Sequence, residues 1–138
     1  QYPGVRLYLE RIKQQAAERG YVETLLGRKR YFPELQANSK VPAQVKSSAQ
    51  RMAVNHPIQG TAADMIKIAM IRIDARLQRD RYRARMLLQV HDELVFEAPP
   101  DEVERLTDMV RTEMASALQV SVPILVDVGV GANWAEAH

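Results

Sequence analysis

The sequence contains no cysteine. Disulfide bonds and thiolate metal sites are therefore excluded, and any bound metal must be held by oxygen or imidazole ligands. No stretch approaches the roughly 18 consecutive apolar residues that a membrane-spanning helix needs, and the N-terminus lacks the basic-then-apolar pattern of a signal peptide. These absences predict a soluble, cytoplasmic chain without a membrane partner. The chain begins with Gln1 rather than methionine, which suggests a piece of a longer protein.

Apolar residues make up 46% of the 138 residues, enough for the core of one domain-sized unit. The charges are segregated along the chain. Residues 1–50 contain nine Lys/Arg and four Asp/Glu, residues 51–92 eight and four, and residues 93–138 two and nine. A basic front two-thirds suggests a polyanionic partner, because clustered cations release counterions from a phosphate backbone. A solvated surface with uneven charge is the alternative.

The hydrophobic periodicity predicts an α+β fold. Helices are expected over residues 5–19, 43–56 and 58–80, with Pro57 ending or kinking the helical path between the last two. A helix over residues 101–119 is expected to be N-capped by Asp101. Residues 21–26 read as a short strand and residues 32–42 as a surface loop. A β-hairpin is expected over residues 84–98, and alternating apolar residues over 122–130 predict a closing strand.

The tip of the predicted 84–98 hairpin carries His91, Asp92 and Glu93, where a tight turn would normally contain glycine. A carboxylate raised on two strands is a suitable ligand for Mg²⁺, which binds few protein carboxylates and leaves positions for substrate phosphates. Asp92 and Glu93 are therefore candidate metal ligands. A solvated tip, or a structural hydrogen bond between His91 and Asp92, is the alternative.

Two further groups suggest contact with nucleic acid. Arg51, Asn55 and Gln59 are spaced four residues apart, so they project to one side if the helical path survives Pro57. Such side chains can donate hydrogen bonds to the acceptors of the DNA minor groove, although they could equally be polar residues at a kinked helix. The basic run Arg28, Lys29 and Arg30 is followed by two aromatics, a composition suited to phosphate contact and base packing unless those aromatics enter the core.

Together, three ordered segments resemble a known family. They are GYVETLLGRKRY at 20–31, RMAVNHPIQGTAAD at 51–64 and LQVHDELV at 88–95, and they resemble the C-terminal third of the polymerase region of the bacterial DNA polymerase I family, the A-family DNA polymerases. The resemblance covers nearly all 138 residues, including GANW at 131–134. It implies that residues 1–138 form the C-terminal part of a polymerase domain: the palm, whose antiparallel hairpin packs with several helices, and a small part of the fingers. No exonuclease, thumb or motif A segment is included.

The resemblance also implies roles for individual residues. Asp92 corresponds to the motif C aspartate that binds the catalytic metals, with Glu93 an auxiliary acid and His91 a neighbour of the primer end. Arg51, Asn55 and Gln59 correspond to residues that contact the primer–template minor groove. Arg28, Lys29 and Arg30 correspond to a template-contacting segment. The role of residues 36–45 stays open.

The implied reaction is template-directed DNA synthesis, in which a primer 3′-hydroxyl attacks the α-phosphate of a dNTP with the help of two Mg²⁺ ions. The family places a second metal-binding aspartate in motif A and an Arg, a Lys and a Tyr for the nucleotide in motif B. Both motifs normally precede this segment, and neither is present. We therefore expect the isolated chain to be inactive and to need the missing N-terminal portion of the same polymerase.

Three alternatives remain at this stage. A non-catalytic nucleic-acid-binding module would gain nothing from acidic residues near phosphates, where like charges repel unless a metal intervenes. The palm of a single-subunit RNA polymerase can carry a similar His-Asp hairpin, but Gln89, Glu93 and residues 55–60 favour the DNA enzyme. A metal-dependent phosphohydrolase would need more ligands than this chain offers, since the other histidines are His56 and His138.

Overall fold

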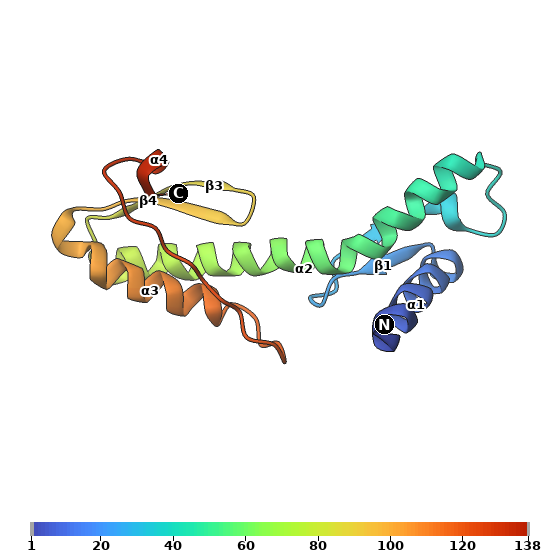
Figure 1. The fold of residues 1–138 in the computed structure, drawn as a ribbon, viewed down its shortest axis with the longest axis horizontal. Coiled ribbons are helices and arrows are strands. Elements are labelled where there is room, and N and C mark those ends of the chain that lie inside the picture. Colours follow the sequence, from blue (N-terminus) through green and yellow to red (C-terminus); the bar gives the residue numbers. More distant parts are fainter. Residues whose placement is uncertain (1, 138) are drawn as a thin grey trace. The chain divides into compact units, whose positions relative to one another are not determined.

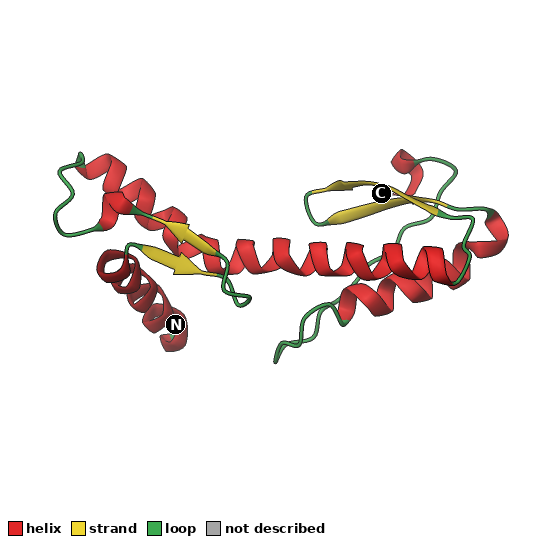
Figure 2. Ribbon diagram, turned by 180° about the vertical axis from the view of Figure 1, so that it is seen from behind, coloured by secondary structure: helices red, strands yellow, loops and turns green. Residues whose placement is uncertain are grey.

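The structure is a computed structural model that describes residues 2–137 and divides into two compact units, the first ending at Ala62 and the second starting at Ala63. Helices combine with two antiparallel two-stranded sheets, so the predicted α+β class is confirmed (Figures 1 and 2). In the part of the chain that is described, no helix is long and apolar enough to cross a membrane.

The first unit opens with helix α1 (Pro3–Arg19). Pro3 suits the first helical position, because the N–H that it lacks would have no partner within the helix and its fixed φ is already helical. Gly20 ends it in a left-handed conformation, φ 75°, and its N–H bonds to the carbonyl of Ala16 at 3.0 Å. The predicted strand over 21–26 is only half formed. Strand β1 (Tyr21–Glu23) stops at Thr24, which starts the turn into β2 (Lys29–Tyr31), with Gly27 at φ 80°.

One apolar cluster holds this first unit together. It joins α1, the β1–β2 hairpin, the short 3₁₀ helix η1 (Pro33–Leu35) and the N-terminal half of the long helix α2 (Ala43–Arg79). Its buried members are Ile12, Ala16, Val22, Phe32, Leu35, Ala49 and Ala53. Of the two aromatics after the basic run, Phe32 therefore enters the core, whereas Tyr31 stays exposed.

Helix α2 contains Pro57 in its interior, so of the two expected outcomes, an end or a kink of the helical path, the end at this proline is wrong. Proline removes one amide donor and its ring crowds the carbonyl four residues earlier, so the rest of the helix must offset a cost of about 3 kcal/mol. Helical residues on both sides are anchored by apolar packing, Ala49 and Ala53 before the proline and Ile73 after it. The hydroxyl of Thr61 also donates a short hydrogen bond to the carbonyl of Pro57.

The second unit packs the C-terminal half of α2 against α3 (Val103–Ala115) and the hairpin of β3 (Arg85–Val90) and β4 (Glu93–Glu97). The hairpin expected over residues 84–98 is thus confirmed. Its register pairs Met86 with Phe96 and Val90 with Glu93, with a bulge at Leu87. Buried core residues of this unit are Ala69, Ile73, Leu77, Ala84, Leu106, Met109, Val110 and Ala117, and Met86, Leu94 and Phe96 pack against them.

The start of α3 corrects a second expectation. Asp101 is not the N-cap, because a 3₁₀ turn, η2 (Pro100–Glu102), precedes the helix and Glu102 occupies the cap position without a capping hydrogen bond. The side chain of Asp101 instead forms an ion pair with Arg83. The helix also ends at Ala115 rather than near residue 119. Directly after its end, the hydroxyl of Ser116 donates a hydrogen bond to the carbonyl of Thr112.

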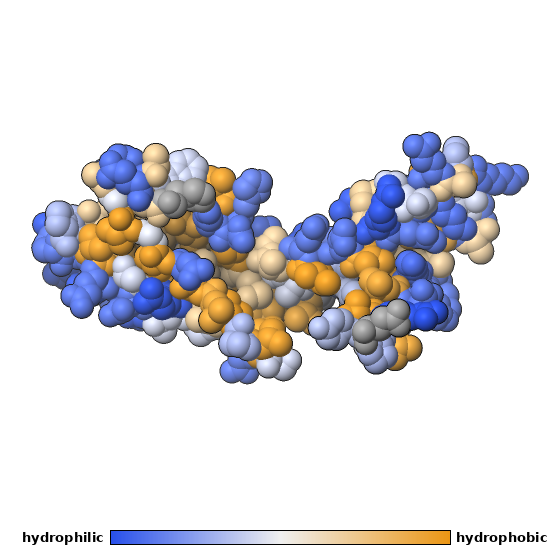
Figure 3. Space-filling model, viewed as in Figure 1, coloured by the Kyte–Doolittle hydropathy of each residue, from blue (hydrophilic) through white to orange (hydrophobic). Residues whose placement is uncertain are grey.

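The closing strand expected over residues 122–130 is absent from the described structure, where these residues have no regular conformation. Alternating apolar residues favour a strand only where a neighbouring backbone offers hydrogen bonds, and no described strand pairs with this segment. Leu125 is 86% exposed and Val122 66%. Apolar surface is visible where this segment and α3 lie (Figure 3). The chain continues to the short helix α4 (Trp134–Ala137).

Candidate functional site

The β3–β4 hairpin presents its polar tip through a two-residue turn. His91 and Asp92 form the turn, and Glu93 is already the first residue of β4, paired with Val90. His91 has φ 54°, a left-handed conformation that glycine or asparagine adopts at lower cost. The side-chain amide of Gln89 donates a hydrogen bond of 2.7 Å to the carbonyl of His91. Asp92 is exposed at the tip, as the sequence predicts.

The opposite end of this hairpin is held by a buried carboxylate. Glu102 accepts hydrogen bonds from the backbone N–H groups of Arg83 and Ala84, at 2.9 and 3.0 Å, and from the Nε of Arg83 at 3.3 Å. Burial alone would raise the pKa of Glu102, but the backbone and guanidinium hydrogen bonds outweigh it and leave that pKa below its ordinary value. The chain is thus fixed immediately before β3 begins.

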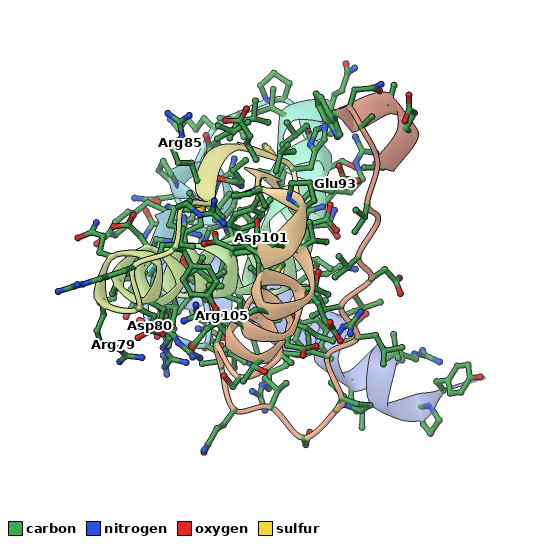
Figure 4. The ribbon with its side chains drawn as sticks, turned by 90° about the vertical axis from the view of Figure 1, so that its left-hand side faces the viewer. Arg79, Asp80, Arg85, Glu93, Asp101 and Arg105 are labelled. Atoms are coloured by element: carbon green, nitrogen blue, oxygen red, sulfur yellow. The ribbon has the colours of Figure 1, made fainter. Side chains whose placement is uncertain are left out.

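The hydrogen bonds from Arg83 and Ala84 to Glu102 form what we call the Glu102 clamp. Charged side chains surround this clamp. Figure 4 looks onto this end of the unit, with Arg79 and Asp80 where α2 ends, Asp101 in η2 and Arg105 in the first turn of α3. Arg105 lies over the ring of Tyr82, 4.2 Å from its centroid, and donates a hydrogen bond of 3.3 Å to the carbonyl of Asp80. Arg79 pairs with Asp80, and Arg85 pairs with Glu97. Each arginine labelled in Figure 4 therefore has a partner within the protein. This end of the unit is thus a network of ion pairs and hydrogen bonds within the protein.

The three polar residues of α2 lie on one side of a single helix. Because the helix continues through Pro57, Arg51, Asn55 and Gln59 are successive four-residue neighbours, and all three are exposed. The first and last are separated by about 12 Å along the axis, from the rise of about 1.5 Å per residue. The sequence predicts that these three side chains project to one side only if the helical path survives Pro57. Helix α2 fulfils this condition.

The β1–β2 hairpin places the three cations of the basic run in different surroundings. Arg28 donates a hydrogen bond of 3.0 Å to the carbonyl of Gly60 in α2. Arg30 lies opposite Val22 and contacts the sulfur of Met52, at 3.4 Å, on the side that faces the core. Lys29 projects from the other face, where it lies 3.7 Å from Glu23. The three cations predicted as one group therefore point to different surroundings, although all three residues are exposed.

The carboxylates at the hairpin tip fit a magnesium site only in part. Asp92 and Glu93 offer the oxygen donors that Mg²⁺ prefers. Within residues 2–137, however, no group of three or more acidic or histidine side chains is placed to hold a metal ion. The chemistry of these two donors is suitable for Mg²⁺, which usually takes one or two protein carboxylates and fills its other positions with water and substrate phosphates.

Two features of these surfaces do not appear among the sequence-based predictions. The clamp at Glu102 is one, because nothing in the pattern places residue 102 beside residues 83 and 84. The other is the position of Tyr21, which faces Tyr31 across the β1–β2 hairpin. The register is centred on Leu26, one residue before the turn glycine Gly27, which is a signal that is present in the sequence.

Comparison with known proteins agrees with this arrangement. A sequence profile of DNA polymerase family A matches residues 1–136, and the chain belongs to this family. It is 50% identical over 136 residues to DNA polymerase I of Bacillus caldotenax and 48% identical over 137 residues to that of Pseudomonas aeruginosa. It is also 49% identical over 136 residues to the thermostable DNA polymerase I of Thermus thermophilus.

These matches cover 99% of this chain but only 15% to 16% of the relatives, so the chain spans a small part of their length. A solved structure, the POL domain of Pol1 from M. smegmatis in complex with DNA primer-template and dNTP, superimposes with a TM-score of 0.92 at 46% identity. The superposition covers 99% of this chain and 24% of that one. The resemblance stated from the sequence motifs is confirmed.

Proposed function

We propose that the protein carrying this chain is a DNA-directed DNA polymerase, a nucleotidyltransferase that extends a primer 3′-hydroxyl with dNTPs under the direction of a template. Residues 1–138 would form the C-terminal part of its polymerase domain, the palm with a small part of the fingers. The observation that carries the proposal is the exposed Asp92 on a two-residue turn, in a chain that matches a polymerase domain over its whole length. The solved relative holds primer-template and dNTP.

In this proposal, the hairpin tip lies at the reacting end of the primer. Asp92 and Glu93 would hold Mg²⁺, two ions in all, together with an aspartate from outside the chain. When bound, the magnesium supplies positive charge at the reacting phosphate. His91 would lie beside the primer end. The two-residue turn would contribute by holding the backbone of Asp92 at the tip, so that less reorganisation is needed when the substrates bind.

The remaining site residues would hold the DNA. Arg51, Asn55 and Gln59 can donate hydrogen bonds along about 12 Å of helix to minor-groove acceptors, which every correct base pair presents. Lys29, Arg28 and Arg30 would contact template phosphates, which position the duplex without reading sequence. Arg28 would do so from a guanidinium that also bonds to Gly60. The relatives are bacterial, which supports a cytoplasmic role in DNA replication and repair.

The direct test is primer extension. The full-length protein should extend a labelled primer on a template with dNTPs and Mg²⁺, and should strongly prefer dNTPs to ribonucleotides. The isolated chain should not, because it supplies too few carboxylates for the metal. Preference for ribonucleotides would favour an RNA polymerase instead. Extension by residues 1–138 alone would refute the assignment of the missing ligands to another part of the protein.

A further inference from the structure

We propose that the outer face of the β1–β2 hairpin binds an unpaired base of single-stranded DNA, with Tyr31 and Tyr21 as the stacking surface and Lys29 as the phosphate contact. The inference rests on the proposed function only in taking DNA as the partner. It adds a binding surface for single-stranded template outside the paired primer–template.

The geometry of the hairpin separates this surface from the core. The register pairs Tyr21 with Tyr31 and Glu23 with Lys29, and these four side chains share the face opposite Val22. Val22 is fully buried, whereas Tyr31 is 68% exposed. The Tyr31 ring is therefore an aromatic face turned to solvent and is not needed to fill the core.

Aromatic and cationic groups lie in contact on this face. The rings of Tyr21 and Tyr31 have centroids 5.7 Å apart and are tilted by 59°. The ammonium of Lys29 lies over the Tyr21 ring, 4.5 Å from its centroid. Two rings at this angle cannot stack fully on each other, so the outer face of Tyr31 remains open to another flat group.

The chemistry of this face selects an unpaired nucleotide. Aromatic side chains beside a cation are the recurring means of binding single strands without sequence preference, because every base has a stacking face. In a duplex those faces are covered by neighbouring base pairs, so the same surface gains only the phosphate contact there. We therefore expect the surface to favour single-stranded over double-stranded DNA.

Glu23 allows a test of the direction in which DNA affinity should change. Its carboxylate lies 3.7 Å from the Lys29 ammonium, and both side chains are partly exposed. A phosphate that approaches Lys29 competes with Glu23 and is repelled by it. Removal of the Glu23 charge should therefore strengthen DNA binding at this face, whereas loss of the Tyr31 ring should weaken it.

A purely structural role makes a different prediction. Cross-strand aromatic pairs stabilise hairpins by packing alone. If Tyr31 serves only that purpose, its replacement affects every ligand of the hairpin alike. Stacking instead requires that the effect depend on the presence of a base.

The experiment compares two probes that differ only in their bases. Fluorescein-labelled oligothymidine and an abasic oligomer of equal length are titrated with the full-length protein at low salt, and anisotropy is read. Tyr31→Ala should weaken oligothymidine binding about tenfold, from the usual contribution of stacking per base. Its binding to the abasic oligomer should not change. Tyr31→Phe should behave as wild type, and Glu23→Gln should tighten both probes.

A second measurement does not depend on affinity. Oligothymidine that carries 5-iodouracil, irradiated on the wild-type protein, should crosslink to Tyr31 or Tyr21. Equal losses for both probes in Tyr31→Ala, no loss for either, or crosslinks mapped only elsewhere would each overturn the inference. Primer extension by the wild-type protein, measured in parallel, separates this outcome from a failure of the proposed function, which would appear as absent extension.

Discussion

The guanidinium of Arg28 donates a hydrogen bond of 3.0 Å to the backbone carbonyl of Gly60, so the turn of the β1–β2 hairpin is joined to the interior of α2. The backbone N–H of Leu25 adds a second link, 3.0 Å from the hydroxyl of Thr61. The hairpin approaches α2 at Gly60, which is the one glycine of that helix. A side chain at position 60 would meet the Thr24 methyl at 2.6 Å.

Gly60→Ala should therefore destabilise the first unit despite the higher helix propensity of alanine. Overpacking of this kind costs about 1–3 kcal/mol, which equals or exceeds the gain of about 1 kcal/mol from replacing a helical glycine. Denaturant unfolding, or hydrogen exchange of residues 24–28, would measure the effect. Gly4→Ala is the matched control, because nothing lies within 4 Å of its added methyl group. Equal stability of the two variants would contradict the close approach.

Glu102→Gln should loosen the start of β3. The amide can still accept one hydrogen bond, but it loses the negative charge that the Arg83 guanidinium and two backbone N–H groups surround. Hydrogen exchange of the Arg83 and Ala84 amides in the full-length protein should speed up. Glu104→Gln, an exposed neighbour on α3, should leave this exchange unchanged.

The same clamp should depend on pH. The folded-state pKa of Glu102 lies below its ordinary value of 4.5, so the stabilisation is complete above that value and is lost as the pH falls through the lower folded one. After correction for intrinsic exchange rates, the difference between wild type and Glu102→Gln should be large near neutral pH and shrink in acid. A difference that grows as the pH falls below 4.5 would show that the sign is wrong.

Asp92→Asn should abolish primer extension and leave primer–template affinity nearly intact. The substitution removes a charged metal ligand of the proposed site without changing its size, and loss of several kcal/mol of transition-state stabilisation corresponds to about a thousandfold in rate. Single-turnover extension and a DNA-binding titration give the two quantities. Asp127→Asn, another exposed aspartate of the same unit, is the control. If activity and DNA binding fall together, a folding defect is the better explanation.

Gln59→Ala should act mainly on mismatched primers. We expect loss of a minor-groove contact worth about 1–3 kcal/mol, and the loss should be felt most where a mispaired end has already disturbed the geometry. The ratio of extension from matched and mismatched primer ends is the measurement. Gln44→Ala changes another exposed glutamine of α2 and should leave the ratio unchanged. An unaltered ratio in Gln59→Ala would count against the minor-groove assignment.

His91→Gly should separate stability from activity. Glycine adopts φ 54° freely, so the turn should gain about 1 kcal/mol. Primer extension should nevertheless fall, because the imidazole that the proposal places beside the primer end is gone. The His91→Asn variant should also tolerate this backbone, and it tests whether a polar side chain suffices. A destabilised His91→Gly protein would show that the imidazole makes structural contacts that outweigh the backbone strain.

Local patterns predicted the elements that local chemistry determines. Two apolar runs on either side of a polar turn predict the β3–β4 hairpin, and Gly20, which can adopt a left-handed conformation, predicts the end of α1. The position of Asp92 at a turn followed from the same pattern. These features depend on residues that are neighbours in sequence.

The errors concern contacts between distant residues. Pro57 predicts an end or a kink of the helix; the end does not occur, because α2 runs through the proline, with Ala53 and Ile73 buried in apolar clusters on either side of it. Asp101 has the chemistry of a helix cap, yet Arg83 engages it as an ion pair. The alternation at 122–130 predicts a strand, but a strand also requires a partner backbone, which no pattern within the segment can report.

The unpaired state of the 122–130 segment has a practical consequence. An irregular stretch with exposed apolar side chains can form a strand against its copy in another molecule, and short two-stranded sheets offer further open edges. Recombinant residues 1–138 should consequently self-associate as their concentration rises, and light scattering would detect it. Biochemical work is better carried out on the full-length polypeptide, or with solubilising charges introduced at Val122 and Leu125.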